Sequence, residues 1–428
     1  MKLHCDIQLP ASKSESNRAL MIATYGGFAP DFQNLSDSKD TQTLLEALRG
    51  LPPMDSIADP PTHQRNGNGG HPRIIDIADC GTAARFLTTF LACHSGTWFL
   101  TGTERMKQRP IKPLVEALRC LGASIQYAEK EGFLPLKIEG KPISGGKVQI
   151  DMSQSSQFAS SLLLAAPMWP QGLEMELLGK LSSFPYLEMT LTMMRHFGAE
   201  IEFNGKMTKV FPKPYQSRNF TIEPDWSAAS YWYEIAALSE ACEIRLHGLC
   251  GPSTGSGTAS LQGDAIIAEW MKMLGVSTLY DCDSLVLTKI PFEKRPLRFD
   301  FSATPDLFPT MAATCAGLQL EARFSGISNL VLKESDRIGA MKTELEKIGA
   351  KLDYDSENEL VLKTSAQLPF YQRSHPLRFA SHGDHRIVMA LAPLSISLGH
   401  MAFDCLEVVE KSYPNYWLGA SFLQIVTR

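Results

Sequence analysis

Residues 329–350 read NLVLKESDRIGAMKTELEKIGA, a dense run of charge followed by a helical pattern and a glycine. The apolar side chains recur at the spacing of one helix face: Ile338, Met341, Leu345 and Ile348. Gly349 suits the left-handed position that ends such a helix, and we expect Ser335 to cap its start. The stretch therefore predicts an amphipathic helix with Lys333 and Arg337 at its start.

The ending of this helix recurs along the chain. Each copy is an apolar residue, a glycine and a small residue, roughly 75 residues from the next: Leu121-Gly122-Ala123, Phe197-Gly198-Ala199, Leu274-Gly275-Val276 and Ile348-Gly349-Ala350. A second series of similar spacing marks the starts of partner helices: Ser14, Gly81, Ser155, Ser227, Asp306 and Gly383. The two series predict six related units of mixed helix and strand, which suggests two domains of three units each.

The composition is that of an ordinary soluble globular protein. Of 428 residues, 44% are hydrophobic and 20% are charged, and the length is sufficient for two or three domains. The formal net charge of −5 argues against a nucleic-acid or anionic-membrane partner, because those need a broad basic surface. No apolar run approaches the roughly 20 residues of a membrane span.

The nine cysteines are scattered, with no Cys-x-x-Cys pair and no histidine cluster at metal spacing. An odd number of dispersed cysteines indicates reduced thiols rather than a disulfide framework. We therefore expect a cytoplasmic protein without a metal site, and separately we expect a monomer.

Lys333 and Arg337 are unusual at a helix start, because the N-terminal pole already carries partial positive charge. Similar cations recur near other predicted helix starts: Lys13, Arg18, Arg85, Arg105, Lys107, Arg109, Arg386 and Lys411. Hydroxyl and amide donors add to them: Ser155, Ser156, Gln157 and Ser183. A single run of this kind can be a solvated surface, but the whole set predicts a site for a small ligand with several phosphate or carboxylate charges.

Two carboxylates are candidate proton-transfer groups. Glu334 lies among the cations of the opening stretch, and Asp306 lies in the turn of residues 304–309. Either can serve as a general acid or base. The structural alternatives are a helix cap for Asp306 and an ion-pair partner of Arg337 for Glu334. His385 can likewise be a hydrogen-bonded scaffold residue.

Two glycine-rich stretches carry no predicted chemistry. Asp59–Arg73 has no hydrophobic period and is typical of a surface loop. Gly251–Gly257 lacks the Gly-Lys-Ser/Thr ending of a phosphate-binding loop, so we interpret it as a turn.

The charged and polar residues discussed above lie in short motifs whose identity and order match those of a known family. These motifs are Ser12-Lys13-Ser14-Glu15-Ser16-Asn17-Arg18, Gly81-Thr82-Ala83-Ala84-Arg85, Arg105-Met106-Lys107-Gln108-Arg109-Pro110, Ser155-Ser156-Gln157, Pro185-Tyr186, Pro305-Asp306, Lys333-Glu334-Ser335-Asp336-Arg337, Asp384-His385-Arg386 and Lys411. Over this span, and in this order, the chain closely resembles the 5-enolpyruvylshikimate-3-phosphate synthase family. The resemblance covers almost the whole chain.

The resemblance implies an α/β fold of two domains, an inverse α/β barrel in which each domain has three βαβαββ units with helices buried inside. It places the first domain at residues 1–11 plus 223–428 and the second at residues 12–222, with the active site in the cleft between them. Cations from both domains would repel one another until anionic substrates arrive, so we also expect domain closure on binding.

The resemblance implies transfer of the enolpyruvyl group of phosphoenolpyruvate to the 5-hydroxyl of shikimate 3-phosphate, with release of phosphate and without a cofactor. Family positions place these residues around shikimate 3-phosphate: Lys13, Ser14, Arg18, Ser155, Ser156, Gln157, Ser183, Tyr186, Asp306, Asn329 and Lys333. They place these around phosphoenolpyruvate: Lys13, Gly81, Arg109, Gln157, Arg337, Arg386 and Lys411. Asp306 would accept a proton and Glu334 would donate one, with Lys13 a further catalytic candidate.

The chain departs from the family pattern at Asp79 and at Phe86, and three rival functions are to be weighed. One of them, phosphoryl transfer, would need a nucleotide loop or a pair of metal-binding carboxylates, and the sequence shows neither. Many family members have Asn where this chain has Asp79, whose charge would weaken phosphoenolpyruvate binding unless it is protonated or turned toward Arg85 or Arg109. UDP-N-acetylglucosamine enolpyruvyl transferases have Lys-Asn in place of Lys13-Ser14, and a reactive cysteine in the loop held here by Arg105–Pro110. A non-catalytic anion-binding relative would be expected to have lost a catalytic residue.

Overall fold

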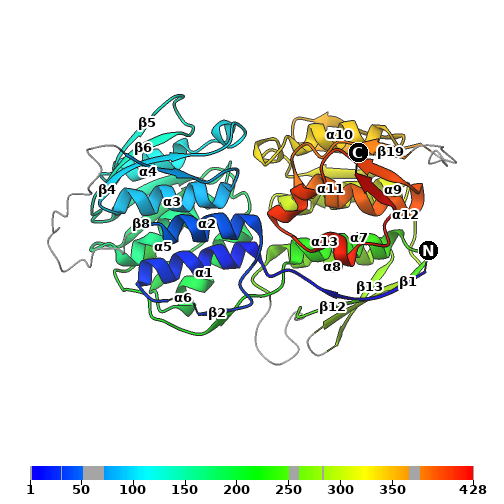
Figure 1. Cartoon of the computed structure of the whole chain (residues 1–428), viewed down its shortest axis with the longest axis horizontal. Coiled ribbons are helices and arrows are strands. Elements are labelled where there is room, and N and C mark those ends of the chain that lie inside the picture. The colour runs from blue at the N-terminus through cyan, green and yellow to red at the C-terminus, as the bar shows by residue number, and fades with distance from the viewer. Residues whose placement is uncertain are drawn as a thin grey trace. The chain divides into compact units, whose positions relative to one another are not determined.

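The computed structural model describes residues 2–29, 31–51, 72–249, 260–281, 284–365 and 376–427. The predicted turn at Gly251–Gly257 and residues 59–71 of the predicted loop lie outside these ranges. Two compact units are distinguished by their internal contacts (Figure 1). Unit 1 comprises Met1–Lys13, Ser36–Lys39 and Ile222–Arg428, and unit 2 comprises Ser14–Leu35 and Asp40–Thr221.

The described strands of unit 2 are β2 (Phe32–Gln33), β3 (Arg73–Asp76), β4 (Gly96–Thr101), β5 (Ser124–Tyr127), β6 (Leu136–Gly140), β7 (Gly146–Asp151), β8 (Leu173–Leu178), β9 (Ile201–Phe203), β10 (Met207–Val210) and β11 (Phe220–Thr221). Its helices are α1 (Lys13–Gly26), α2 (Lys39–Arg49), α3 (Gly81–Cys93), α4 (Lys112–Cys120), α5 (Gln157–Ala165) and α6 (Phe184–His196). The first residues of α1 and α2 belong to unit 1.

The described strands of unit 1 are β1 (Lys2–Gln8), β12 (Ala241–His247), β13 (Val276–Asp281), β14 (Ser284–Lys289), β15 (Leu297–Asp300), β16 (Ala322–Ser325), β17 (Ala350–Ser356), β18 (Glu359–Thr364), β19 (Leu377–Phe379), β20 (Met401–Phe403) and β21 (Ile425–Thr427). Its helices are α7 (Trp226–Leu238), α8 (Ile267–Lys272), α9 (Phe308–Gly317), α10 (Arg337–Glu346), α11 (His385–Leu391), α12 (Ser395–Leu398) and α13 (Tyr416–Gly419).

Four sheets share one strand order, which confirms a mixed α/β fold built from repeated units. The orders are β3-β4-β6-β5 and β7-β8-β10-β9 in unit 2, and β1-β12-β14-β13 and β15-β16-β18-β17 in unit 1. In each sheet the first two strands are parallel and the other pairs are antiparallel. The sheet that contains β1 is completed only after the chain returns from unit 2, so the first repeat of unit 1 is discontinuous.

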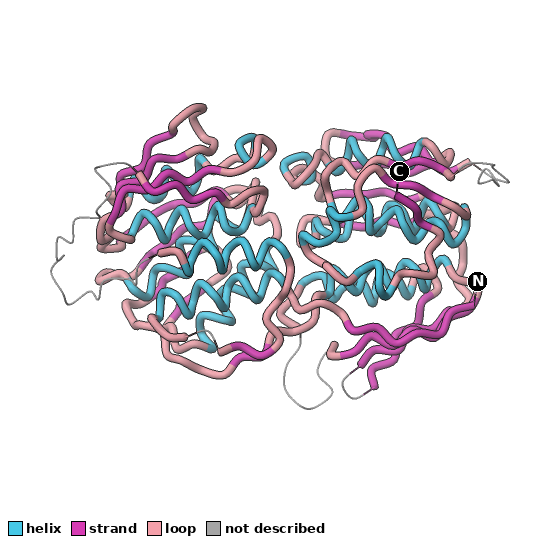
Figure 2. The backbone as a smooth tube through the Cα atoms, viewed as in Figure 1, coloured by secondary structure: helices cyan, strands magenta, loops and turns pink. Residues whose placement is uncertain are grey.

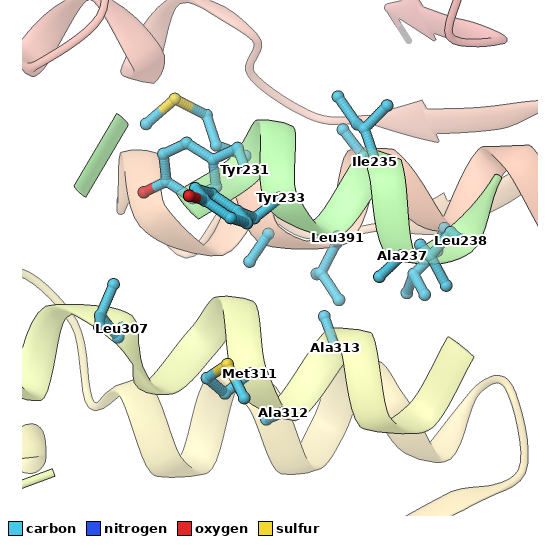
Figure 3. Close-up of a cluster of buried hydrophobic side chains, with 14 of the residues drawn as sticks. Tyr231, Tyr233, Ile235, Ala237, Leu238, Leu307, Met311, Ala312, Ala313 and Leu391 are labelled. Atoms are coloured by element: carbon cyan, nitrogen blue, oxygen red, sulfur yellow. The ribbon is translucent and has the colours of Figure 1, made fainter. Parts of the chain in front are cut away.

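Helices form the core of unit 1. Every residue of α7 is buried, because its sequence is apolar or small on nearly all sides rather than on one stripe. Figure 3 shows part of this core, in which Ala237 and Leu238 of α7 lie on the side toward Met311, Ala312 and Ala313 of α9. In the view of Figure 2, strands of unit 1 lie both above and below its helices.

The predicted turn glycines adopt the left-handed conformation. Their φ values are +92° at Gly122, +93° at Gly198, +84° at Gly275 and +78° at Gly349. The predicted cap of α10 is wrong by one residue: Asp336 accepts the backbone N–H of Gly339 at 3.1 Å. The Ser335 hydroxyl instead donates to the Asp384 carboxylate at 3.1 Å. This hydroxyl therefore takes part in a tertiary contact and does not cap α10.

The seven cysteines among the described residues are free thiols. No helix in the described part of the chain has both the length and the apolar character that a membrane crossing requires.

Glu234 on α7 gives a stability prediction. Both of its carboxylate oxygens are buried without a hydrogen-bond partner, and burial raises the pKa of Glu234 well above its usual value. A raised pKa means that the folded state holds an extra proton above about pH 4.5, so stability falls as the pH rises. We expect Glu234→Met to raise the free energy of unfolding by about 1–3 kcal/mol at pH 8, and less at pH 5. The measurement is denaturant unfolding of the wild type and of Glu234→Met at pH 5 and pH 8. An equal loss of unfolding free energy in both proteins between pH 5 and pH 8 would contradict the prediction.

Candidate active site

Arg337, the first residue of α10, organises a buried charge cluster in unit 1. Its side chain is 1% exposed. The guanidinium donates to Asp306 at 2.7 Å, to Glu334 at 2.8 Å and to Asp384 at 2.9 Å. These three carboxylates come from separate segments, so one arginine fixes the turn before α9, the stretch before α10 and the start of α11.

Asp306 lies in a 3₁₀ turn, Pro305–Leu307, and not at a helix cap. One carboxylate oxygen accepts from Arg337 and the other accepts from Arg386 at 2.8 Å. Burial by itself would raise the pKa of Asp306, but the charges of Arg386, Arg337 and Lys333 hold it well below its usual range. The carboxylate is therefore ionised, and the structural prediction of a simple cap is wrong.

Glu334 is an ion-pair partner of Arg337, the same arginine that bonds Asp306. Its side chain is largely buried, and it precedes Asp336, the cap of α10. The ion-pair reading of Glu334 is confirmed at 2.8 Å. Arg337 thus holds Glu334 and Asp306 on the same guanidinium.

The segment before α11 supplies a second arginine. Asp384 is fully buried and caps α11 by accepting the backbone N–H of Arg386 at 2.9 Å. Arg386 also donates to the Tyr231 hydroxyl of α7 at 3.4 Å. Burial, together with the charges of Lys13 and Arg386, holds the pKa of His385 well below its usual range, so that imidazole is neutral.

The remaining candidates of unit 1 differ in burial. Asn329 and Lys411 are buried, whereas Lys13 and Lys333 are partly exposed. Lys333 lies close enough to Asp306 to lower the pKa of that carboxyl. The exposed ammonium groups are suited to an anion that enters from solvent.

In unit 2, Arg18 of α1 forms a second cationic centre. Its buried guanidinium donates to the Thr190 hydroxyl at 2.7 Å and to the backbone carbonyls of Ser14 and Tyr186 at 2.9 and 3.1 Å. Burial lowers the pKa of Arg18 to about 10, against the opposing effects of Tyr186 and Glu15. The group remains charged at neutral pH, and a nearby anion would stabilise it.

Arg109 packs directly against the start of α3. A Cβ atom built on Gly81 would lie 2.5 Å from the Arg109 guanidinium, so only glycine leaves room for this contact. Arg85 donates to the carbonyls of Gly81 at 3.1 Å and Pro110 at 2.8 Å, which joins the two segments. Asp79 lies in the turn before α3.

The polar residues at the starts of α5 and α6 complete the set in unit 2. Gln157 begins α5, its backbone N–H bonds the Ser155 hydroxyl at 3.2 Å, and its side chain donates to the Thr82 hydroxyl at 3.2 Å. Ser156 is buried at the cap position. Ser183 has a left-handed backbone, with φ of +57°, and its buried hydroxyl has no hydrogen-bond partner in the protein. An orphaned hydroxyl of this kind fits a ligand oxygen.

The sequence candidates are divided between the two units. Unit 1 holds Lys13, Asp306, Asn329, Lys333, Glu334, Arg337, Arg386 and Lys411; unit 2 holds Ser14, Arg18, Gly81, Arg109, Ser155, Ser156, Gln157, Ser183 and Tyr186. Sequence reasoning missed Tyr231 and Thr190 as partners of the arginines. Thr190 follows Tyr186 by one helical turn, which was a usable signal, but nothing local marks Tyr231 among its apolar neighbours.

Comparisons with known protein sequences all indicate the same family, and each match covers nearly the whole chain. A family model described as EPSP synthase (3-phosphoshikimate 1-carboxyvinyltransferase) matches residues 1–418. A Bacteroides fragilis protein named 3-phosphoshikimate 1-carboxyvinyltransferase is 41% identical over 417 residues, covering 97% of this chain and 94% of that protein. A protein of the same name from Sulfurovum sp. is 35% identical over 422 residues, covering 96% and 95%.

Solved structures show a similar fold. EPSP synthase from Acinetobacter baumannii superposes with a TM-score of 0.69 at 20% identity, covering 98% of this chain and 96% of that one. The enolpyruvyl transferase NikO from Streptomyces tendae gives 0.66 at 16% identity, covering 98% and 95%. At these identities the likeness concerns the fold alone. Together with the full-length sequence matches, it leads to one assignment: the chain belongs to the EPSP synthase (3-phosphoshikimate 1-carboxyvinyltransferase) family.

Proposed function

We propose that the chain transfers the enolpyruvyl group of phosphoenolpyruvate to the 5-hydroxyl of shikimate 3-phosphate and releases phosphate. The reaction proceeds by addition and elimination through a tetrahedral intermediate and serves aromatic amino acid biosynthesis. The observation that carries the proposal is the buried Arg337, which binds both Asp306 and Glu334 in a chain of this family. The chemistry needs one group to take the hydroxyl proton and another to protonate the enol methylene.

Shikimate 3-phosphate is proposed to bind mainly to unit 2. The support is the buried Arg18, the orphaned hydroxyl of Ser183 and the donors at the starts of helices. The proposed ligands are Lys13, Ser14, Arg18, Ser155, Ser156, Gln157, Ser183, Tyr186, Asp306, Asn329 and Lys333. A phosphate at these positions would replace water and complete the hydrogen bonding of the site.

Phosphoenolpyruvate is proposed to bind Lys13, Gly81, Arg109, Gln157, Arg337, Arg386 and Lys411. Arg337 and Arg386 hold the pKa of Asp306 low. The anionic groups of phosphoenolpyruvate would partly neutralise these two guanidinium charges and so weaken their effect on Asp306. The pKa of Asp306 would then rise toward a value at which it can accept the 5-hydroxyl proton. Glu334 is proposed as the donor to the enol methylene, with Lys13 as a further catalytic group.

We further propose that both residue sets act on the same pair of substrates, and that the two units close around them. The functional domains are taken as residues 1–11 plus 223–428 and residues 12–222, with the active site in the cleft between them. The support is that the proposed ligands are divided between the units and are mostly cationic or neutral donors. We expect the radius of gyration in X-ray scattering to fall when shikimate 3-phosphate and a phosphoenolpyruvate analogue are added together. An unchanged radius would contradict closure.

The finer architecture proposed is the inverse α/β barrel, with βαβαββ units around buried helices. It is supported by the four sheets of identical order and by the complete burial of α7. A cytoplasmic location is proposed on the free thiols of the described cysteines, which suit a reducing compartment. The protein is also proposed to be a monomer.

The rival activities fit less well. UDP-N-acetylglucosamine enolpyruvyl transfer is disfavoured, because Lys13 is followed by Ser14 and no cysteine lies in Arg105–Pro110. A non-catalytic relative is disfavoured because Asp306, Glu334 and Lys13 are all present.

The test is phosphate release from phosphoenolpyruvate by the purified protein, with and without shikimate 3-phosphate. We expect release only when shikimate 3-phosphate is present. Tight binding of shikimate 3-phosphate without any release would overturn the proposed activity and would implicate Asp79. A parallel assay with UDP-N-acetylglucosamine as acceptor tests the rival transferase.

A further inference from the structure

Glu344 of α10 is a buried carboxylate that the proposed reaction does not use. Its side chain is 1% exposed, yet it makes three polar contacts. It accepts from Lys347 at 2.6 Å, from the backbone N–H of Ala380 at 3.1 Å and from a ring nitrogen of His382 at 2.9 Å. Two of these donors lie in the segment between β19 and α11, so Glu344 ties α10 to that segment.

His382 is held in a restrictive backbone conformation. Its φ is +52°, in the left-handed region that residues other than glycine adopt uncommonly. The following residues are Gly383 and Asp384, and the backbone N–H of Asp384 bonds the Ser381 carbonyl at 3.0 Å. The bond from His382 to Glu344 therefore fixes a tight turn that ends at Asp384.

Asp384 connects this turn to the two arginines Arg337 and Arg386. It accepts from Arg337 at 2.9 Å and from Ser335 at 3.1 Å, and it caps the helix in which Arg386 is the second residue. α10 is thus attached to one short segment at two places, by Arg337 at its start and by Glu344 two turns later. A shift at His382 would move Arg337 and Arg386 relative to each other.

We propose that Glu344 and His382 form a positioning pair for the cations that bind phosphoenolpyruvate. The pair does not touch the substrate; it holds the turn so that Asp384 presents Arg337 and Arg386 in the binding geometry. This inference rests on the proposed function, since it assumes that these two arginines hold phosphoenolpyruvate. It predicts a larger defect for phosphoenolpyruvate than for shikimate 3-phosphate, because most proposed ligands of shikimate 3-phosphate, Arg18 among them, belong to unit 2, whereas the turn is attached directly to Arg337 and Arg386.

The primary variant is His382→Asn. Asparagine tolerates the left-handed backbone, but its amide is too short to replace the bond to Glu344. We expect the KM for phosphoenolpyruvate to rise about tenfold, with the KM for shikimate 3-phosphate changed less than about twofold and kcat less than about threefold. His382→Gln, whose longer amide can donate to Glu344, is expected to restore much of the affinity for phosphoenolpyruvate.

Lys342→Ala is the matched control. Lys342 is also on α10 and pairs with Asp353 at 2.6 Å, but its side chain is 50% exposed and its partner belongs to β17, outside the turn. We expect the control to leave both KM values unchanged. An unchanged KM for phosphoenolpyruvate in His382→Asn, or an equal rise in both KM values, would overturn the proposal. The proposed function is tested separately with the wild-type enzyme. If wild-type phosphate release depends on shikimate 3-phosphate, the proposed function is supported whatever the result for His382→Asn.

Discussion

Glu334→Gln is expected to lower kcat by about two to four orders of magnitude, the usual contribution of a positioned general acid. Glutamine keeps the size of the side chain and can still accept a hydrogen bond from Arg337, so the fold around the buried cluster should persist. It cannot deliver a proton to the enol methylene. The measurement is phosphate release from phosphoenolpyruvate at saturating shikimate 3-phosphate, with binding of shikimate 3-phosphate followed separately.

Glu359→Gln provides the matched control for this variant. Glu359 also pairs with an arginine of unit 1, at 2.6 Å from Arg323, and its side chain is only partly exposed. Loss of this pair should leave kcat within about twofold, because surface ion pairs contribute little. A kcat for Glu334→Gln within about tenfold of wild type would remove Glu334 from proton transfer and leave it as a structural partner of Arg337.

The turns of the fold could be predicted from sequence because their cause is local. A glycine after an apolar helix end is the residue that reaches the left-handed conformation at least cost, and Gly122, Gly198, Gly275 and Gly349 all adopt it. The same local rule explains why the repeated units leave a regular spacing of glycines in the sequence.

The cap of α10 shows where local rules end. Ser335 and Asp336 are both good cap residues, and nothing in their immediate sequence distinguishes them. The choice is made by Asp384, which is 49 residues away in the chain and takes the Ser335 hydroxyl. Pairing of this kind depends on which segments the sheets bring together, and that information is not present in a short window of sequence.

The chemical character of Asp306 was also beyond local reasoning. Its position in a Pro-Asp turn favours a cap, whereas two arginines from separate helices bond its carboxylate. The sequence position of Asp306 made it a proton-transfer candidate, and the resemblance to a known family agreed with that choice. The depressed pKa and its cause come only from the spatial arrangement. The result is a group that is a weak base until an anion neutralises its neighbours.

Arg337→Met is expected to have the largest effect on stability. Methionine fills much of the same volume, but it leaves Glu334 and Asp384 without the Arg337 guanidinium and removes one of the two arginines that bond Asp306. Removal of one partner from a buried ion pair typically costs about 3–5 kcal/mol, because the remaining charge stays buried. Thermal unfolding of the affected unit should move down by roughly 10 °C at pH 7.5.

Arg323→Met is the control for this loss. Arg323 also pairs with two carboxylates, Asp355 and Glu359, but its side chain is 35% exposed. Water and salt screen these charges, so we expect a much smaller change in unfolding temperature for the control. Equal shifts in the two variants would show that burial of the Arg337 cluster does not set its contribution.

The pH dependence of Arg337→Met follows from the sign of the Asp306 shift. In the wild type the pKa of Asp306 is depressed, so the ion pairs stabilise the protein above the unfolded pKa near 4, and this contribution is lost as the pH falls toward the folded pKa. Without Arg337 the buried carboxylates would have higher pKa values and would take up protons more readily. The difference in unfolding free energy between wild type and variant should therefore be largest above about pH 5 and should shrink as the pH falls through 4 toward 3. A difference that is constant over this range would show that lost packing, rather than uncompensated charge, is the cause.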